Sequence, residues 1–353
     1  MAIRVMIMAG GTGGHVFPAL AVAQYLREAG HQVTWLGTKQ GIEARLVPEA
    51  GFDIDWLSVS GLRGKGLLRL LLSPFMLLKA CLQASSIIRQ RKPDVVLGLG
   101  GFASGPGGLM SWAHRRPLVI HEQNRVPGTT NRLLEPIACR VLEAFPKSFE
   151  PSAKATFSGN PIRKELLLNN RQQRGATPRI LVLGGSLGAS ILNQVVPEAL
   201  KELQQEITVE VIHQAGKTTI DRAHARYEEM GVNADIRSFI EDMKAVYEWA
   251  DLVICRAGAM TVSELAIMGL PAVLVPLPHA IDDHQTRNAA YLADEDAACL
   301  IPQSELTAAS LASTLGDLLR NKETLSSMAD KARTLAKPEA TKLVADSCLE
   351  VAL

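Results

Sequence analysis

RVMIMAGGTGGH, residues 4–15, is an arginine followed by a short apolar run, a glycine pair, a hydroxyl residue and more glycine. RILVLGGSLGAS, residues 179–190, repeats this order of residue types. An almost continuous apolar run is typical of a parallel strand that is covered on both faces. The two glycine pairs begin at Gly10 and Gly184, 174 positions apart in a chain of 353 residues. The repeat therefore predicts an α/β protein with two βαβ-type domains of similar size.

The boundary between the domains is predicted near residues 158–163 (SGNPIR), where a Gly-Asn-Pro turn precedes a polar, helix-like segment. We assign residues 1–162 to an N-terminal domain and residues 163–337 to a C-terminal domain. A helix-like segment with regularly placed apolar residues covers about residues 338–353. Because such a helix needs a surface for its apolar face, it is expected to pack back on the N-terminal domain.

The composition excludes several classes of protein. The chain has 37 basic and 36 acidic residues, so no global positive field attracts a nucleic acid. The five cysteines are widely spread and form no CxxC pair, which argues against disulfides and a thiolate zinc site and favours a reducing cytoplasm. The N-terminus does not resemble a signal peptide, and no apolar stretch reaches the length of a membrane-spanning helix.

Three glycine-rich loops follow predicted strands, at residues 10–15, 98–108 and 184–190. Backbone N–H groups attract anions where such a loop opens a helix, which favours a diphosphate ligand. The alternative is that glycine only permits tight packing of strand and helix. The dinucleotide fingerprint fails because Val16 stands where its third glycine should be, and the P-loop pattern fails because position 211 is valine.

A nucleotide site is predicted at residues 256–264 (RAGAMTVSE), where a strand turns into a helix. The helix start with Thr261 and Ser263 suits a diphosphate, and Glu264 is placed to accept both hydroxyls of a ribose. The alternative is that Thr261 or Ser263 caps the helix and Glu264 only favours its dipole. Residues 274–278 are predicted as the next strand, before a polar loop at the ligand-binding edge.

Seven motifs occur in register over essentially the whole chain: GGTGGHVFP (10–18), GFASGPGG (101–108), HEQN (121–124), GNPIR (159–163), GGSLGA (184–189), RAGAMTVSE (256–264) and DDHQTRNA (282–289). Together they resemble the MurG family, the bacterial N-acetylglucosaminyltransferases of peptidoglycan synthesis. The number and order of the motifs make this resemblance far more specific than a single glycine loop.

The resemblance implies the GT-B glycosyltransferase fold, with two Rossmann-like, doubly wound domains that face each other across a cleft. It implies transfer of N-acetylglucosamine from UDP-N-acetylglucosamine to the 4-hydroxyl of N-acetylmuramoyl-pentapeptide on lipid I, which gives lipid II and UDP. The anomeric configuration inverts, and neither a metal nor another cofactor is implied. The N-terminal domain would bind the acceptor and the membrane, and the C-terminal domain would bind the donor.

The resemblance also implies where the donor is bound. Ile240 resembles the residue whose backbone binds uracil, and Glu264 resembles the residue on the ribose hydroxyls. Ser186 resembles the hydroxyl at the diphosphate, and Gln285 resembles a contact near the sugar. Further implied donor contacts are Arg163, Ala259, Met260, Thr261, Val262 and Ser263 and, from the first domain, Thr12, Gly13, Gly14 and Asn124, which would close over the N-acetylglucosamine.

Inverting transfer is an in-line displacement that needs a base for the incoming hydroxyl and charge stabilisation for the departing UDP. His15 is the first candidate for the base, or for a residue that orients the acceptor, because it lies at the mouth of the expected cleft and histidine suits proton transfer near neutral pH. Glu122 is the second candidate. The alternative for His15 is a residue at a helix start that only bonds backbone or phosphate.

Membrane contact is expected at residues 62–81, where leucines alternate with a few cations. The sequence alone slightly favours a buried core helix, whereas the resemblance favours a peripheral patch on the cytoplasmic face of the inner membrane. The expected partners are UDP-N-acetylglucosamine, lipid I, an anionic membrane surface and no nucleic acid. Cell-wall synthesis or division proteins are further candidate partners. Cations expected at the rim are Lys65, Arg69, Lys79, Arg89, Arg91, Lys92, Arg115 and Arg116, with Trp112 beside them.

Two rival classes of function remain open at this point. One is another sugar-nucleotide enzyme of the same fold, such as an epimerase or a transferase with a different acceptor, and the choice of acceptor would separate it. The other is a non-catalytic nucleotide-binding or scaffold subunit at the membrane. The presence of His15, Arg163 and Glu264 argues against a scaffold, which does not need them.

Overall fold

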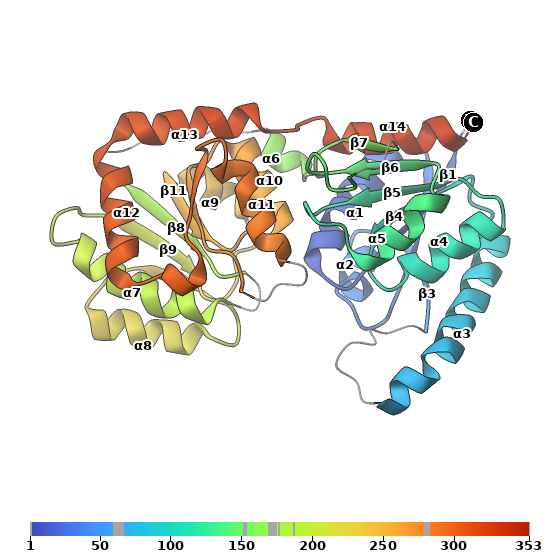
Figure 1. Cartoon of the computed structure of the whole chain (residues 1–353), viewed down its shortest axis with the longest axis horizontal. Helices are drawn as coiled ribbons and strands as arrows, with labels where there is room; N and C mark the ends of the chain where they lie inside the picture. The colour runs from blue at the N-terminus through green and yellow to red at the C-terminus, as the bar shows by residue number, and fades with distance from the viewer. Residues whose placement is uncertain are drawn as a thin grey trace. The chain divides into compact units, whose positions relative to one another are not determined.

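The computed structural model describes residues 2–58, 67–150, 154–168, 175, 177–185, 188–278 and 283–352, with the backbone alone for residues 67–73. The chain divides into two compact units (Figure 1). Unit 1 comprises Met1–Arg163 and Lys337–Leu353, and unit 2 comprises Lys164–Ala336.

A parallel sheet forms the centre of unit 1 and has seven strands in the described part of the chain. The strand order is β3-β2-β1-β4-β5-β6-β7, and every pairing is parallel. This parallel sheet confirms the α/β architecture that residues 4–15 predict for the first half of the chain. The strands are β1 (Arg4–Ala9), β2 (Gln32–Gly37), β3 (Asp53–Trp56), β4 (Val95–Gly100), β5 (Leu118–Glu122), β6 (Arg140–Glu143) and β7 (Ala155–Phe157).

Helices cover both faces of this sheet, because successive side chains of a strand point to opposite faces. Val5 and Ile7 of β1 pack in one cluster with apolar residues of α1 and α14, which adjoin each other (Figure 1). Met6 and Met8 pack in the other cluster, with α3 and residues next to α4. The helices are α1 (Gly13–Glu28), α2 (Glu43–Glu49), α3 (Leu67–Arg91), α4 (Ser104–Ala113), α5 (Thr129–Leu134), the 3-10 helix η1 (Glu135–Ile137) and α14 (Ala340–Ala352).

Unit 2 repeats this plan with a parallel sheet of six described strands, in the order β10-β9-β8-β11-β12-β13. These are β8 (Arg179–Leu183), β9 (Glu210–Gln214), β10 (Asp235–Arg237), β11 (Leu252–Cys255), β12 (Ala272–Leu274) and β13 (Ala298–Leu300). The predicted strand at 274–278 is wrong in its bounds, because β12 ends at Leu274. Pro276 and Pro278 cannot donate to a sheet ladder, which explains the early end.

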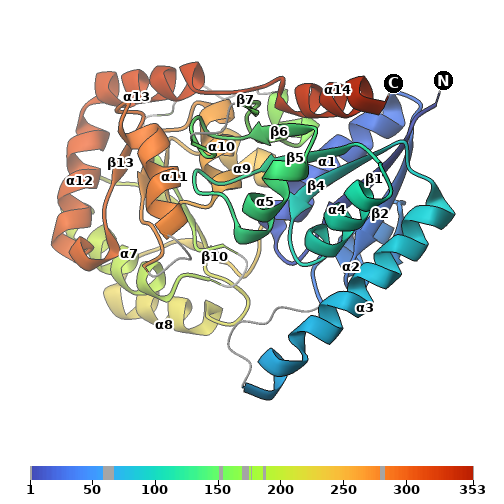
Figure 2. The ribbon, with the colours of Figure 1, turned by 45° about the vertical axis from the view of Figure 1, so that its right-hand side comes forward.

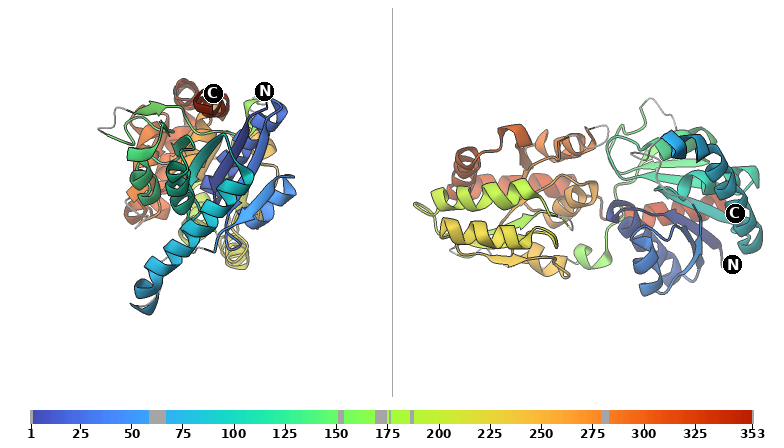
Figure 3. Two further views of the ribbon diagram at one scale, coloured as in Figure 1. Left: turned by 90° about the vertical axis from the view of Figure 1, so that its right-hand side faces the viewer. Right: turned by 90° about the horizontal axis from the view of Figure 1, so that it is seen from below.

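The helices of unit 2 lie on both sides of its sheet (Figure 2; Figure 3, right). Apolar residues of α7, α8 and α12 pack with Ile180 and Val182 in one core. The helices are α6 (Lys164–Leu167), α7 (Ser190–Leu203), α8 (Ile220–Met230), α9 (Met243–Trp249), α10 (Ala259–Met268), α11 (His284–Ala293), the 3-10 helix η3 (Gln303–Glu305), α12 (Ala308–Arg320) and α13 (Lys322–Thr334).

The strand order of each sheet reverses at one point, between β1 and β4 in unit 1 and between β8 and β11 in unit 2. Open α/β sheets bind ligands at such switch points, beyond the carboxyl ends of the strands. The glycine loops after β1, β4 and β8 all lie at these two points. Among the described residues, no helix combines the length and the apolar character needed to cross a bilayer.

Candidate active site

The switch point of unit 1 is built from two glycine loops in direct contact. The loop after β1 contains Thr12, the N-cap of α1, and leads into Gly13 and Gly14 in its first turn. The loop after β4 contains Gly101, whose position is so close to the first loop that a Cβ there would overlap the carbonyl oxygen of Gly10. Glycine is therefore required sterically where the two loops meet.

His15 lies between these two loops. Its Nδ1 is 3.1 Å from the carbonyl oxygen of Gly10. A Cβ at Gly100 would come within 3.0 Å of Cδ2 and Nε2 of the imidazole, so the ring lies against the end of β4. The side chain is half-buried at the crevice between β1 and β4. This is the position in the sheet where a group is best placed to act on a bound substrate.

Glu122 is buried at the end of β5 and accepts four hydrogen bonds. Its Oε1 accepts from the backbone N (2.9 Å) and from Nδ2 (3.2 Å) of Asn124. Its Oε2 accepts from the backbone N of Gly128 (3.0 Å) and from Nδ2 of Asn131 (2.9 Å). A carboxylate with its lone pairs used in this way holds a loop in place. The geometry therefore favours Glu122 as a group that positions Asn124, and it leaves His15 as the stronger candidate base.

His121 is a histidine of a different kind, fully buried beside Glu122. Its Nε2 is 2.9 Å from the carbonyl oxygen of Gly159, and its Nδ1 is 2.9 Å from Nε2 of Gln123. Because the carbonyl only accepts, Nε2 carries the proton. Burial is the largest effect on this ring and lowers its pKa to about 4. His121 therefore stays neutral near pH 7 and ties β5 to the turn at Gly159.

Arg163 closes this part of the site. Its guanidinium lies over the ring of Phe17 on α1, 5.5 Å from the ring centroid. The contact is a cation–π arrangement that places a positive charge beside the first glycine loop. Unit 1 thus brings Arg163, His15 and the N-terminus of α1 into one region.

In unit 2 the helix α10 begins directly after β11 at the switch point. Its N-cap is Gly258, so neither Thr261 nor Ser263 occupies the capping position. The residues Ala259, Met260, Thr261, Val262 and Ser263 form the first turns of α10. An N-terminus of this kind, opening at the carboxyl edge of the sheet, suits an anionic ligand.

Glu264 lies on the inner side of α10 and is 9% exposed. Its Oε2 accepts a hydrogen bond of 2.9 Å from the hydroxyl of Tyr247 on α9, which fixes the carboxylate. The thiol of Cys255 at the end of β11 has a pKa raised to about 12, chiefly by burial and also by the charge of Glu264. The negative charge of Glu264 is therefore held close to the start of α10.

The remaining predicted donor contacts of unit 2 are placed as follows. Ile240 is buried between β10 and α9, next to the exposed ring of Phe239. Gln285 is in α11, where its Oε1 accepts from the backbone N of Leu277 at 2.9 Å. Ser186, predicted at the diphosphate, lies outside the described residues.

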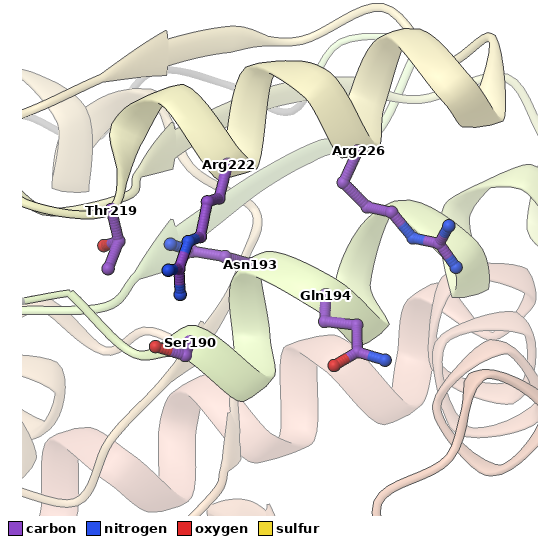
Figure 4. A pocket seen from close by; sticks show the side chains of 6 residues that line it. All are labelled: Ser190, Asn193, Gln194, Thr219, Arg222 and Arg226. Atoms are coloured by element: carbon purple, nitrogen blue, oxygen red, sulfur yellow. The ribbon is translucent and has the colours of Figure 1, made fainter.

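A cavity of about 220 Å³ lies between α7 and α8 (Figure 4). Arg222 and Arg226 line it, and the side chain of Arg226 is paired with Glu198 and Glu229. Asn193 lines the cavity, and its Nδ2 donates to the carbonyl oxygen of Ala215 at 3.0 Å. The six lining residues differ from the predicted donor contacts and were missed by the sequence analysis: Ser190, Asn193, Gln194, Thr219, Arg222 and Arg226. Among the described residues, no group of three or more His, Cys, Asp or Glu side chains is arranged to hold a metal ion.

Comparison with protein families agrees with this architecture. The N-terminal domain model of glycosyltransferase family 28 matches residues 5–143, and the C-terminal domain model of the same family matches residues 179–344. The chain belongs to glycosyltransferase family 28, and its two parallel α/β units confirm the predicted GT-B class.

Within glycosyltransferase family 28, the chain is similar over its whole length to proteins of one named kind. The chain is 56% identical over 354 residues to a protein of Stutzerimonas stutzeri, covering 100% of this chain and 99% of the relative. It is 57% identical over 352 residues to a protein of Pseudomonas paraeruginosa, covering 99% of each. Both are named UDP-N-acetylglucosamine–N-acetylmuramyl-(pentapeptide) pyrophosphoryl-undecaprenol N-acetylglucosamine transferase. A crystal structure of Acinetobacter baumannii MurG has a TM-score of 0.85 at 44% identity and covers 99% of each chain.

Proposed function

We propose that this protein transfers N-acetylglucosamine from UDP-N-acetylglucosamine to the 4-hydroxyl of N-acetylmuramoyl-pentapeptide on lipid I, and so forms lipid II and UDP. The observation that carries this proposal is the full-length identity of 56–57% to relatives that are named for this transfer. Identity at this level extends over both units and both switch points. The proposal assigns no cofactor and no metal to the reaction.

The first step of the mechanism is assigned to unit 1. The acceptor hydroxyl oxygen attacks the anomeric carbon while the bond from that carbon to the UDP oxygen breaks. His15 takes the hydroxyl proton as general base, because its imidazole lies at the β1/β4 switch point. Attack opposite the leaving group inverts the anomeric configuration. Asn124, held by Glu122, and residues Thr12, Gly13 and Gly14 contact the N-acetylglucosamine in this assignment.

In the same proposal, the positive N-terminal end of a helix dipole and an arginine side chain stabilise the departing UDP. The N-terminus of α10, residues 259–263, faces the diphosphate, and Ser186 keeps the diphosphate role that the family resemblance implies. Arg163 supplies a full positive charge. Glu264, fixed by Tyr247, accepts the ribose hydroxyls, Ile240 binds uracil through its backbone, and Gln285 contacts the sugar.

A lipid-linked acceptor requires contact with the bilayer, and α3 with α4 is the proposed contact surface. Phe75, Leu78 and Leu82 of α3 are 71%, 58% and 64% exposed, and Trp112 of the neighbouring α4 is 55% exposed. Ala84 and Ile88 on the same helix are buried, so α3 packs one face on the sheet and exposes a second apolar face. Exposed cations such as Lys79 and Arg115 suit an anionic leaflet. We therefore assign the protein to the cytoplasmic face of the inner membrane as a peripheral enzyme.

The experiment that tests the function is transfer of radiolabelled N-acetylglucosamine from its UDP donor to a lipid I analogue, with a chelator present. Label in a lipid II product supports donor, acceptor and metal independence together. The variant His15→Gln, assayed in the same way, should lower kcat by at least about a hundredfold, which is the lower end of the range for loss of a general base. Binding of UDP by the wild type without transfer to lipid I would overturn the proposed acceptor.

A further inference from the structure

Glu43 is a buried carboxylate that no predicted motif contains. It is the first residue of α2 and is fully buried. Its Oε2 accepts from the backbone N of Gly11 at 2.9 Å. Its Oε1 accepts from the backbone N (3.1 Å) and from the hydroxyl (2.7 Å) of Thr38. Glu43 thus joins the end of β2 to the first glycine loop.

The surrounding glycines leave room for this carboxylate. A Cβ at Gly10 would lie 2.8 Å from Cδ of Glu43, and a Cβ at Gly41 would lie 2.6 Å from the same atom. A Cβ at Gly37 would lie 3.0 Å from Cγ. Part of the glycine content of this region therefore accommodates Glu43, apart from any direct contact with a phosphate.

Glu43 and His15 form hydrogen bonds with the same peptide group, the one between Gly10 and Gly11. The N–H of Gly11 and the C=O of Gly10 belong to the same planar unit, and they point in opposite directions in a trans peptide. The N–H donates to Glu43, and the carbonyl oxygen is 3.1 Å from Nδ1 of His15. Because a carbonyl oxygen only accepts, Nδ1 must carry the proton, and the lone pair of the neutral ring is then at Nε2.

We propose that Glu43 is a positioning residue that acts on His15 through the Gly10–Gly11 peptide. An anion bonded to the N–H polarises the amide and strengthens the carbonyl as an acceptor. The stronger acceptor holds the Nδ1–H tautomer, and the negative charge stabilises the imidazolium that forms when Nε2 takes the acceptor proton. This inference rests on the proposed function for its kinetic consequence, whereas the tautomer is a property of the protein alone.

The first test is the tautomer of His15 in the full-length wild type. Protein labelled with ¹⁵N-histidine gives long-range ¹H–¹⁵N correlations for its eight histidines, and the His15 signals are those missing in His15→Gln. We expect a protonated Nδ1 and an unprotonated Nε2. If the His15 ring is protonated at Nε2 instead, the proposal is wrong, and this result needs no substitution at Glu43.

The second test compares Glu43→Gln with Thr38→Val. Glu43→Gln keeps the shape but removes the charge, so kcat should fall about tenfold with the KM for UDP-N-acetylglucosamine unchanged, and the Nε2–H tautomer should gain population. Thr38→Val removes one neutral donor from the other carboxylate oxygen and should leave kcat within about twofold and the tautomer unchanged. If kcat falls equally in both variants, and in proportion to the decrease in their melting temperatures, Glu43 has only a structural role. If the wild type makes no lipid II, the proposed function fails, and the spectra still decide the link between Glu43 and His15.

Discussion

Gly101→Ala tests whether the two glycine loops of unit 1 are fixed by direct backbone contact. Gly101 has a φ of +85°, which costs an L-residue about 1–2 kcal/mol. A Cβ there would overlap the oxygen of Gly10 and lie 3.0 Å from its C and N atoms. Relieving such an overlap in a packed region costs about 1–3 kcal/mol. We expect unit 1 to lose about 2–5 kcal/mol of stability in total.

Two further glycine variants separate the cost of a positive φ from the cost of overlap between a new Cβ and its neighbours. Gly11 has a φ of +89° and nothing within 4 Å of a built Cβ, so Gly11→Ala should cost about 1–2 kcal/mol. Gly105 lies inside α4 with only a methyl group of Thr130 nearby, at 3.8 Å, so Gly105→Ala should be neutral or stabilise by up to about 1 kcal/mol. The expected order of stability is therefore Gly105→Ala, wild type, Gly11→Ala and Gly101→Ala.

The assay is urea unfolding followed by tryptophan fluorescence. Three of the four tryptophans, Trp35, Trp56 and Trp112, belong to unit 1, and Trp249 belongs to unit 2. In a Trp249→Phe background the signal reports unit 1 alone. Because His15 lies between the two loops, transfer by Gly101→Ala should also slow by about tenfold to a hundredfold. A Gly101→Ala protein as stable as Gly11→Ala would refute the reasoning from overlap.

Three further predictions concern pH, the donor and the membrane. The pKa of His121 is lowered to about 4 in the folded state, so the unfolded state binds the proton first as pH falls. The contribution of His121 to stability should therefore be lost as the pH falls from about 6.5 to about 4, by a few kcal/mol, and His121→Asn should flatten this part of a urea-midpoint profile. Glu264→Gln keeps an oxygen for the Tyr247 hydroxyl but loses the charge, and titration calorimetry should show UDP binding weakened by about tenfold to a hundredfold. Leu78→Glu, at a position 58% exposed, should reduce co-sedimentation with anionic vesicles and leave the melting temperature within about 1–2 °C, whereas unchanged sedimentation would exclude this helix from the contact.

The long apolar runs were predictable from the sequence, because buried parallel strands leave a signal that needs no tertiary context. β1 and β8 coincide with the apolar runs before the glycine pairs at Gly10 and Gly184, where the repeat predicts strands. Short edge strands lack this signal: Asp53–Trp56 in β3 has two acidic residues and no fully buried position. The strand after β11 is predicted to extend to Pro278 because residues 275–278 are apolar. Two of these residues are prolines, which have no N–H for a sheet hydrogen bond, so β12 ends at Leu274.

The loops of the candidate site were predictable where a sequence motif marks them. The buried side chains that hold these loops by hydrogen bonds were not predictable where no motif contains them. Glycine pairs identified the loops after β1, β4 and β8. Glu43 is the first residue of the short helix α2 and has no characteristic spacing to a partner, so only the fold brings it to Gly11. Glu122 was found through its motif, but its four donors, two of them from Asn124, came to light only with the structure.

Unit 1 uses the same chemical device at three loops along the carboxyl edge of its sheet. Glu43 accepts from the N–H of Gly11, Glu122 from those of Asn124 and Gly128, and Glu143 from those of Lys147 and Phe149 at 2.9 and 3.2 Å. Each carboxylate is buried and directs its charge at backbone donors. A buried carboxylate with several such donors fixes a loop strongly, because losing any of them exposes a charge to an apolar interior. Loops held in this way keep their N–H groups and side chains in place before a substrate arrives, which is what a preorganised binding site requires. The glutamates of this edge therefore act on the backbone, and the proposed mechanism assigns proton transfer to His15 instead.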